Sequence, residues 1–216
     1  MSTPGKIAYR GKGNIYVNLT NRCSSACEFC LRDFTDEVYG SGLRLDAEPS
    51  VEEVEQAIEI EFRDGPADEV VFCGFGEPTM RLDALLTICE WLRLRRIPSR
   101  LVTNGHGQLL NPDVEVAPAL AGAGLTKATV SLNAADPASY DLLCRPIFSK
   151  AFRAVLRFAE ECVEQGIETM MTAVDTPETD VAGCEAVAAA LGATFRLRRL
   201  VERTDRTPDK RKDEHD

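Results

Sequence analysis

The sequence has no long hydrophobic run. No apolar stretch approaches the roughly 20 residues that a membrane-spanning helix needs, and the N-terminal MSTPGK contains no hydrophobic secretion segment. We therefore expect a cytoplasmic protein without a membrane partner. A hydrophobic content of 44% and a charged content of 28% are typical of a globular chain. Its 216 residues are enough for one domain with an ordinary core.

An excess of positive charge is also missing. The chain carries 25 Lys and Arg against 35 Asp and Glu, for a formal net charge of −10. Binding to nucleic acid needs clustered Lys and Arg, so we expect no nucleic-acid partner. Basic residues become dense only between 196 and 212, where acidic residues alternate with them. Because apolar residues almost disappear after about 203, we expect a single domain over 1–203 and a disordered charged tail over 204–216.

The eight cysteines do not form the regular framework of a small secreted protein, which agrees with reduced thiols in a reducing compartment. Five of them are scattered, and we expect those in helical patterns to be small buried hydrophobes. These five are Cys73, Cys89, Cys144, Cys162 and Cys184. The other three lie close together at Cys23, Cys27 and Cys30, with three and then two residues between them.

A short loop with this spacing can direct three sulfurs toward one centre. Thiolates select zinc, copper(I) or iron–sulfur clusters. A closed site normally uses four protein ligands, but the next Cys is Cys73 and the first His is His106. Three thiolates on a four-iron cluster would leave one iron open for a small molecule.

Three other interpretations of the cysteines were considered. A zinc site would need a second Cys or His pair, which is absent nearby. Cys27 and Cys30 could form a thiol–disulfide pair, although the thioredoxin-type version opens a helix in a fold that this chain does not predict. Haem attachment would need a His after Cys30, where the chain has Leu31.

Strand-like and helix-like segments alternate along the chain. The expected strands are 15–19, 69–73, 100–103, 128–132, 168–174 and 194–200, and the expected helices begin at Ser50 or span 82–94, 114–123, 150–165 and 181–191. Repeated βα units imply a parallel sheet with right-handed crossovers. Six units are fewer than the eight of a complete barrel. The fold class is therefore α/β, either an open partial (β/α)6 barrel with parallel strands in a single domain, which we adopt, or a doubly wound sheet.

In either fold the chemistry belongs at the carboxyl ends of the strands, where the unusual residues lie. Residues 74–79 read GFGEPT, and their glycines would let backbone approach a ligand while Glu77 accepts hydrogen bonds from an ammonium group. Residues 103–107 read TNGHG. Residues 131–134 read SLNA, and Ser131 and Asn133 share one side of the strand. Each stretch is also compatible with a simple turn.

Further candidate site residues at the strand ends have weaker support from the sequence. Thr172 and Asp175 lie at or near the end of the fifth strand. His106 could donate a proton or contact the substrate, but we expect an exposed loop histidine.

The cysteine motif, including the aromatic Phe29 before its last Cys, resembles the cluster motif of the radical S-adenosylmethionine (SAM) superfamily. Residues 76–78 resemble the superfamily's Gly-Gly-Glu-Pro stretch, with Phe75 in place of the first Gly. The resemblance implies a [4Fe-4S] cluster on the thiolates of Cys23, Cys27 and Cys30. The residues that it implies for SAM binding are Phe29, Gly76, Glu77, Pro78, Thr103, Asn104, Ser131 and Asn133.

The resemblance also implies an oxidoreductase-type activity. Reductive cleavage of SAM would produce a 5′-deoxyadenosyl radical that takes hydrogen from an unidentified small-molecule or protein substrate, with electrons from a one-electron donor such as flavodoxin or ferredoxin. A passive iron–sulfur electron carrier, an activase for a glycyl-radical partner, a deazapurine-forming synthase and a zinc or disulfide-exchange module remain alternatives.

The pattern of the whole chain most resembles the short radical SAM proteins linked to TatD-type nucleases. The residues that carry this closer resemblance are 18–23 (NLTNRC), 131–134, Tyr140 and 143–146 (LCRP).

The last expected strand carries Arg196 and Arg198 on one face. They would either protect an edge strand from pairing with other chains or face the open barrel and hold an anionic substrate group. In the second case, Phe34 and Tyr39 would form part of a lid over that group.

Overall fold

The computed structural model describes residues 5–201, and the expected tail over 204–216 lies outside the described residues. One sheet of seven strands has the order β1-β2-β5-β6-β7-β8-β9. β1 is antiparallel to β2, and all the other neighbours are parallel. The strands are β1 (Ala8–Gly11), β2 (Asn14–Val17), β5 (Val70–Phe72), β6 (Ser99–Thr103), β7 (Lys127–Ser131), β8 (Glu168–Asp175) and β9 (Thr194–Arg199).

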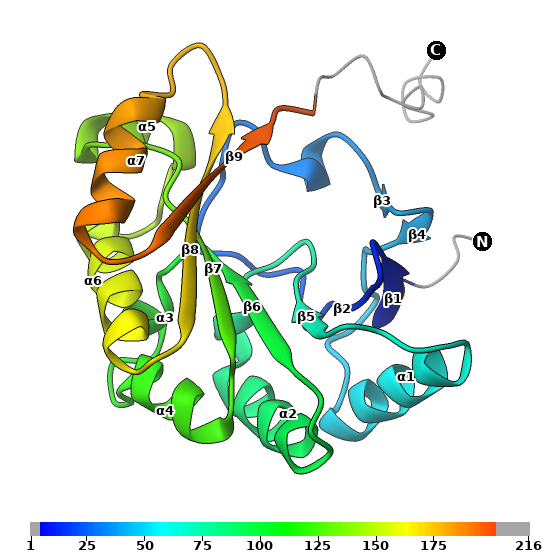
Figure 1. The fold of residues 1–216 in the computed structure, drawn as a ribbon. Coiled ribbons are helices and arrows are strands. Elements are labelled where there is room, and N and C mark those ends of the chain that lie inside the picture. Colours follow the sequence, from blue (N-terminus) through cyan, green and yellow to red (C-terminus); the bar gives the residue numbers. More distant parts are fainter. Residues whose placement is uncertain (1–4, 202–216) are drawn as a thin grey trace, which may run out of the picture.

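The helices cover the convex face of this curved sheet, and the concave side stays open (Figure 1). They are α1 (Val51–Arg63), α2 (Leu82–Leu94), α3 (Gly107–Leu110), α4 (Val116–Ala123), α5 (Pro137–Cys144), α6 (Ala151–Glu164) and α7 (Val181–Ala190). Short 3₁₀ turns form η1 (Leu31–Asp33) and η2 (Pro78–Arg81), and a small hairpin joins β3 (Glu37–Val38) to β4 (Ser41–Gly42). Within the described chain, each helix is too short or too polar to cross a membrane.

Local sequence explains the main elements. The three residues of β5 are fully buried, as expected for a parallel strand. Ser50 and Glu53 form the expected capping box at the start of α1. The apolar face of α6, with Phe152 and Val155, packs into the core. The expected α/β fold with a mostly parallel, partly closed sheet is confirmed.

Several elements were not predicted, among them β1 and α5. β1 forms a hairpin with β2 through a two-residue turn in which Lys12 and Gly13 have φ of 48° and 81°, as a type I′ turn requires. α5 begins after Asp136, whose carboxylate accepts hydrogen bonds from the amides of Ala138 and Ser139, with Pro137 at the first helical position. β1 is only four residues long, and Asp136 and Pro137 are the sequence signal that marks the start of α5.

Candidate active site

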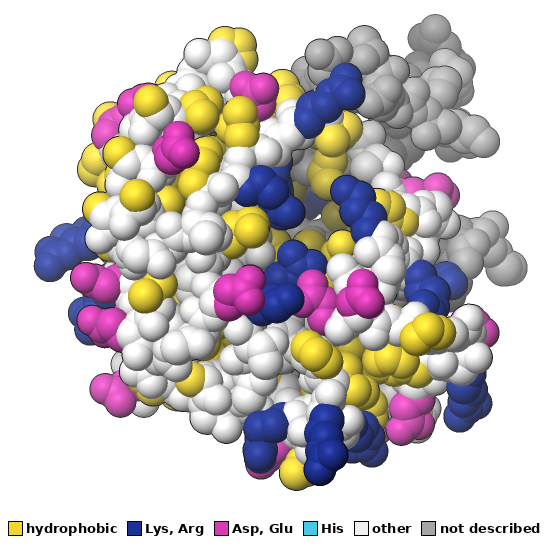
Figure 2. Space-filling view, viewed as in Figure 1, with side chains coloured by type: hydrophobic (Ala, Val, Ile, Leu, Met, Phe, Trp, Pro, Cys, Tyr) yellow, Lys and Arg dark blue, Asp and Glu magenta, His cyan; other side chains and the backbone are white. Residues whose placement is uncertain are grey.

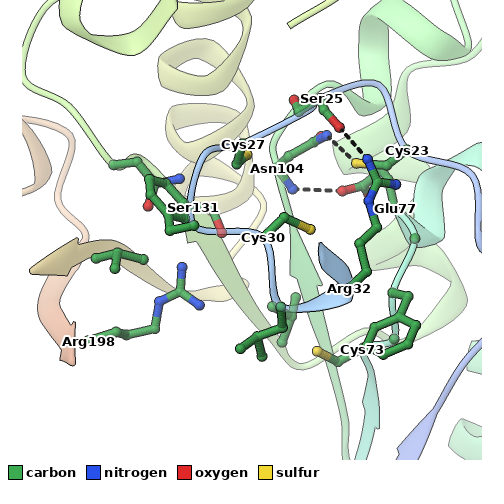
Figure 3. Close-up of a pocket in the computed structure, with 18 of the residues that line it drawn as sticks. Cys23, Ser25, Cys27, Cys30, Arg32, Cys73, Glu77, Asn104, Ser131 and Arg198 are labelled. Carbon is green, nitrogen blue, oxygen red and sulfur yellow. Dashed lines mark hydrogen bonds between the residues drawn. The ribbon is translucent and has the colours of Figure 1, made fainter. Parts of the chain in front are cut away.

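A cavity of about 350 Å³ opens at the carboxyl ends of the parallel strands, within the concave side of the sheet. Its walls come from the segment after β2, from the ends of β5, β6, β7, β8 and β9, and from α5. Figure 3 shows the three motif cysteines, Glu77, Asn104 and Ser131 around this space. Strand ends that are far apart in sequence therefore meet here, as expected for parallel strands.

The cysteine loop, residues 18–30, is held from two sides. On one side the amide of Glu77 donates a hydrogen bond to the carbonyl of Arg22 at 2.8 Å. On the other side the amide of Glu28 donates to the carbonyl of Leu143 at 3.0 Å. Arg145 adds an ion pair with Glu28. The end of α5 and the start of η2 thus clamp a loop that has almost no regular structure of its own.

The thiols of Cys23, Cys27 and Cys30 all line the cavity. Burial raises the pKa of Cys23 to about 11 and also raises the pKa of Cys30. Cys27 is hydrogen-bonded to Cys144, which together with burial raises its pKa well above the ordinary range. The side-chain amide of Asn104 donates toward the sulfur of Cys23 at 3.7 Å. Among the described residues, no three Cys, His, Asp or Glu side chains converge closely enough to hold a metal ion.

These thiols nevertheless suit an iron–sulfur cluster. They lie within eight residues on one loop, face a single cavity, and leave the other walls free for a bound molecule. The guanidinium of Arg32 lies close enough to favour thiolates and lowers the pKa of each of the three, against the larger effects of burial and, for Cys27, of the hydrogen bond to Cys144. Cluster binding would require Cys27 to exchange its hydrogen bond to Cys144 for an iron bond and would drive deprotonation.

Glu77 is 3% exposed and holds two strand-end loops together. Its Oε1 accepts hydrogen bonds from the amide and hydroxyl of Thr79 and from the hydroxyl of Thr103, at 3.1, 2.7 and 2.7 Å. Its Oε2 accepts one from the amide of Asn104 at 2.7 Å. Burial raises the pKa of this carboxyl, and the same hydrogen bonds oppose the rise. Oε2 keeps acceptor capacity for a cationic group in the cavity.

Most of the residues expected at the strand ends meet in this cavity. Its lining includes Phe29, Gly76, Glu77, Thr103, Asn104, Ser131 and Asn133. Pro78 is buried and begins η2, and it is not among the residues that line the cavity. Thr172 is buried and Asp175 is exposed, and neither lines the cavity.

Three buried polar atoms on the cavity residues have no hydrogen-bond partner in the described part of the chain. They are Oδ1 of Asn133, Oγ of Ser25 and Nε of Arg198. Asn133 adopts a left-handed conformation with φ of 59°, which turns it toward the cavity, and its amide group donates to the sulfur of Cys144 at 3.5 Å. A buried acceptor or hydroxyl without a partner is costly, so these atoms are suited to a polar ligand.

The expectation that His106 is an exposed loop residue is wrong. His106 is fully buried, with Nδ1 2.9 Å from the hydroxyl of Ser24 and Nε2 2.9 Å from the hydroxyl of Tyr140. Burial lowers its pKa to about 4, so the ring is neutral at pH 7. The ring joins the cysteine loop to α5, across 82 and 34 residues of sequence.

The two arginines of the last strand separate. Arg198 lines the cavity, whereas Arg196 is exposed and lies outside it. The proposed lid residues are also placed elsewhere: Tyr39 packs against Tyr16 in a tilted contact, with ring centroids 5.5 Å apart, and Phe34 borders a neighbouring pocket. The expectation that Phe34 and Tyr39 cover the site is therefore wrong. The segment after the cysteines reaches the cavity through Leu31, Arg32 and Val38 instead.

The sequence alone did not identify Cys73 and Cys144 as residues of this cavity. Cys73 follows β5 directly, so its place at a strand end was a usable signal. Cys144 ends α5, a helix that was not predicted, and its approach to Cys27 depends on tertiary packing alone.

Comparisons with known proteins agree with this geometry. Residues 17–183 match the sequence profile of the Radical SAM superfamily. A curated relative from Thermococcus kodakarensis, described as "Probable GTP 3′,8-cyclase", is 32% identical over 151 residues, which cover 70% of this chain and 44% of the relative.

Solved structures share the fold at lower identity. SuiB of Streptococcus suis bound to S-adenosylmethionine superposes with a TM-score of 0.63 and 21% identity over 90% of this chain and 40% of SuiB. TYW1 with a lysine-pyruvate adduct superposes with a TM-score of 0.62 and 15% identity over 88% of this chain and 65% of TYW1. The chain therefore spans less than two thirds of the length of each of these three proteins.

Proposed function

The chain belongs to the radical SAM superfamily, and from this premise we propose that it is the catalytic core of an enzyme that cleaves S-adenosylmethionine. The superfamily uses a [4Fe-4S] cluster and SAM as cofactors. One observation carries the proposal: seven residues that the resemblance implies for SAM line the same cavity as the three cysteines of the motif.

In this proposal Cys23, Cys27 and Cys30 hold the cluster. The cofactors supply, when bound, a reductive cleavage that generates a 5′-deoxyadenosyl radical able to take hydrogen from a substrate. Asn104 would stabilise the thiolate of Cys23 by the hydrogen bond that its side chain already donates. His106 and Tyr140 hold the loop in place from behind, because the ring bridges Ser24 and Tyr140.

Glu77 and Asn133 would orient SAM. Glu77 Oε2 can accept a hydrogen bond from the SAM ammonium while Oε1 stays bound to the two threonines. Asn133 Oδ1 lacks a partner among the described residues and can accept a hydrogen bond from a ribose hydroxyl. Phe29 and the other apolar walls would exclude water from the reacting atoms.

The substrate and the electron donor are proposed only by class. Radical SAM enzymes need a reductant, and flavodoxin or ferredoxin would serve here. The Thermococcus relative makes GTP the first substrate to test, and the SuiB complex with a precursor peptide makes a peptide the second. We also propose that the chain belongs to the short group linked to TatD-type nucleases, because residues 143–146 of that pattern clamp the cysteine loop.

The cluster is tested by anaerobic reconstitution of single variants. Alanine at Cys23, Cys27 or Cys30 should abolish the four-iron signal in electron paramagnetic resonance spectra of the reduced protein and most of the bound iron and sulfide. Alanine at Cys89 or Cys162, which are buried in α2 and α6, is the matched control and should leave both intact. Full iron and sulfide in a triple variant that lacks all three motif thiols would refute the assignment.

SAM cleavage separates an enzyme from a passive electron carrier. Reduced wild-type protein should convert SAM to 5′-deoxyadenosine, whereas a carrier would hold the cluster without doing so. The Glu77 and Asn133 geometry favours the enzyme, since a carrier has no need of a buried carboxylate facing a cavity.

A further inference from the structure

Arg198 is a cation inside the cavity that the cofactor assignments leave unused. It lies near the end of β9, and Figure 3 shows its guanidinium directed into the cavity on the side of Ser131 and Cys30, across from Glu77. Figure 2 shows basic side chains around a hollow on this face of the molecule. Arg198 therefore lies across the cavity from the buried carboxylate of Glu77.

The Arg198 guanidinium lacks a counter-charge in the described part of the chain. Its Nε is buried without a hydrogen-bond partner there, and no described Asp or Glu forms an ion pair with it. Burial lowers its pKa from the ordinary arginine range, and the groups that act on it are the thiols of Cys73, Cys27 and Cys144 and the cation of Arg196. Keeping a charge buried without a partner costs free energy.

The other charged groups around the cavity are already engaged or lie at its mouth. Glu77 accepts four hydrogen bonds from neighbouring loops. Arg32 is 3.9 Å from the carboxylate of Asp33 and donates to the carbonyl of Ser25. Arg199 borders the cavity but is exposed. This leaves Arg198 as a cation of the cavity lining for which the described residues supply no anionic partner.

We propose that Arg198 binds the carboxylate or phosphate of an anionic substrate and so orients that substrate in the cavity. The inference rests on the proposed function, because it takes the Glu77 side as the SAM side. A guanidinium presents its donors in a planar fork that matches carboxylate and phosphate oxygens in a bidentate way. The position across the cavity from Glu77 separates this group from the SAM ammonium.

The test is calorimetric titration of reconstituted, SAM-saturated protein with inorganic pyrophosphate and with citrate, which represent the phosphate and carboxylate sources. The variants are Arg198→Gln, Arg198→Lys and, as matched control, Arg196→Gln on the same face of β9 but outside the cavity. Arg198→Gln should lower the affinity for the tighter-binding probe roughly 10- to 150-fold, and Arg198→Lys should lower it less. Arg196→Gln should leave the affinity unchanged.

Three results would overturn the inference. These are no binding of either probe to wild type, equal losses in the Arg196 and Arg198 variants, and a loss of SAM affinity in Arg198→Gln, which would assign the guanidinium to the SAM carboxylate. SAM affinity and cluster content are measured first in wild type, so a failure of the proposed function is seen separately. If Arg198→Gln does not fold, Arg198→Lys decides, because it retains the charge and removes only the fork.

Discussion

At the scale of single residues, Glu77 combines a structural and a binding role. Its Oε1 ties η2 to the end of β6, and its Oε2 retains capacity for a cation. Substitution of Glu77 by glutamine keeps the size of the side chain and removes its charge, so the variant tests the binding role apart from the structural role.

We predict that Glu77→Gln weakens SAM binding roughly 10- to 150-fold in calorimetry while the iron content stays normal, because a charge-assisted hydrogen bond to the ammonium is lost. The matched control is Glu69→Gln. Glu69 is also buried, but it lies before β5 at the opposite edge of the sheet, where it pairs with Arg100 and Lys127 at 2.7 and 3.3 Å. That variant should lose stability and keep its SAM affinity. Equal SAM affinity of wild type and Glu77→Gln would remove Glu77 from the SAM site.

His106 makes a second prediction at this scale, about pH. Its folded pKa of about 4 lies below the unfolded value of 6.5, so between these values the unfolded chain binds the proton more readily than the native one. The stability that the neutral His106 ring contributes is therefore fully present above pH 6.5 and is lost as the pH falls toward 4. For the cluster-free protein, the free energy of unfolding should drop by about 2 kcal/mol more between pH 7 and pH 5 than for His106→Gln.

Urea denaturation at the two pH values measures this difference. His106→Gln should also be less stable at pH 7 by about 1–3 kcal/mol, because one amide cannot replace the ring between Ser24 and Tyr140. The same pH dependence in both proteins would show that the ring is not held neutral.

At the scale of elements, the site depends on how closely the loop after β5 approaches the cysteine loop. A Cβ added to Gly76 would lie 2.3 Å from the carbonyl oxygen of Thr20 and 2.5 Å from that of Arg22. Both are backbone atoms and cannot move without shifting the loop that carries the cysteines. This close approach is the physical reason for glycine at position 76.

Gly76→Ala should therefore destabilise the protein by about 1–3 kcal/mol and lower the iron bound on reconstitution. The matched control is Gly122→Ala in α4, where an added Cβ meets nothing within 4 Å. Alanine there should stabilise the protein by about 0.5–1 kcal/mol, since glycine is unfavourable inside a helix. Thermal unfolding and iron analysis of the two variants test the contrast, and normal iron binding in Gly76→Ala would contradict it.

Hydrophobic periodicity predicted the elements of this chain well where they are long and carry apolar residues along one face. α6 and α2 end within a residue of their expected limits because an apolar face repeats along several turns. β1 and the β3–β4 hairpin were not predicted, since their two to four residues carry neither the continuous apolar run of β5 nor the β-rich alternation of β2. α5 was missed although Asp136 and Pro137 mark its start.

At the scale of the whole molecule, the rule that parallel strands end at one edge predicted most of the site. It brought Glu77, Asn104 and Ser131 into one cavity from three different strand ends. It could not place Cys144 beside Cys27, or His106 between Ser24 and Tyr140, because those contacts depend on how loops and α5 pack. Strand alternation placed Arg196 and Arg198 on one face of the last strand but left open whether that face meets the cavity, and their separation depends on where the cavity ends.

The carboxyl ends and the amino ends of the parallel strands should respond differently to ligands. The cysteine loop relies on local hydrogen bonds, such as that from the amide of Cys30 to the carbonyl of Cys27 at 3.1 Å, whereas β5 to β7 are held by continuous ladders. Regions of low local stability open first and exchange their amides fastest. A ligand that binds only the closed form suppresses that opening by mass action.

Cluster reconstitution followed by SAM at about ten times its dissociation constant should therefore slow amide exchange in residues 22–33 and 74–79 by roughly tenfold or more. The amides at the starts of β5, β6 and β7, beside the Glu69 ion pairs, should exchange at unchanged rates. Hydrogen exchange followed by mass spectrometry measures both regions in one experiment. Uniform slowing over the whole chain would mean that the ligands act on global unfolding, and slowing confined to α1 and α2 would place the binding site on the other side of the sheet.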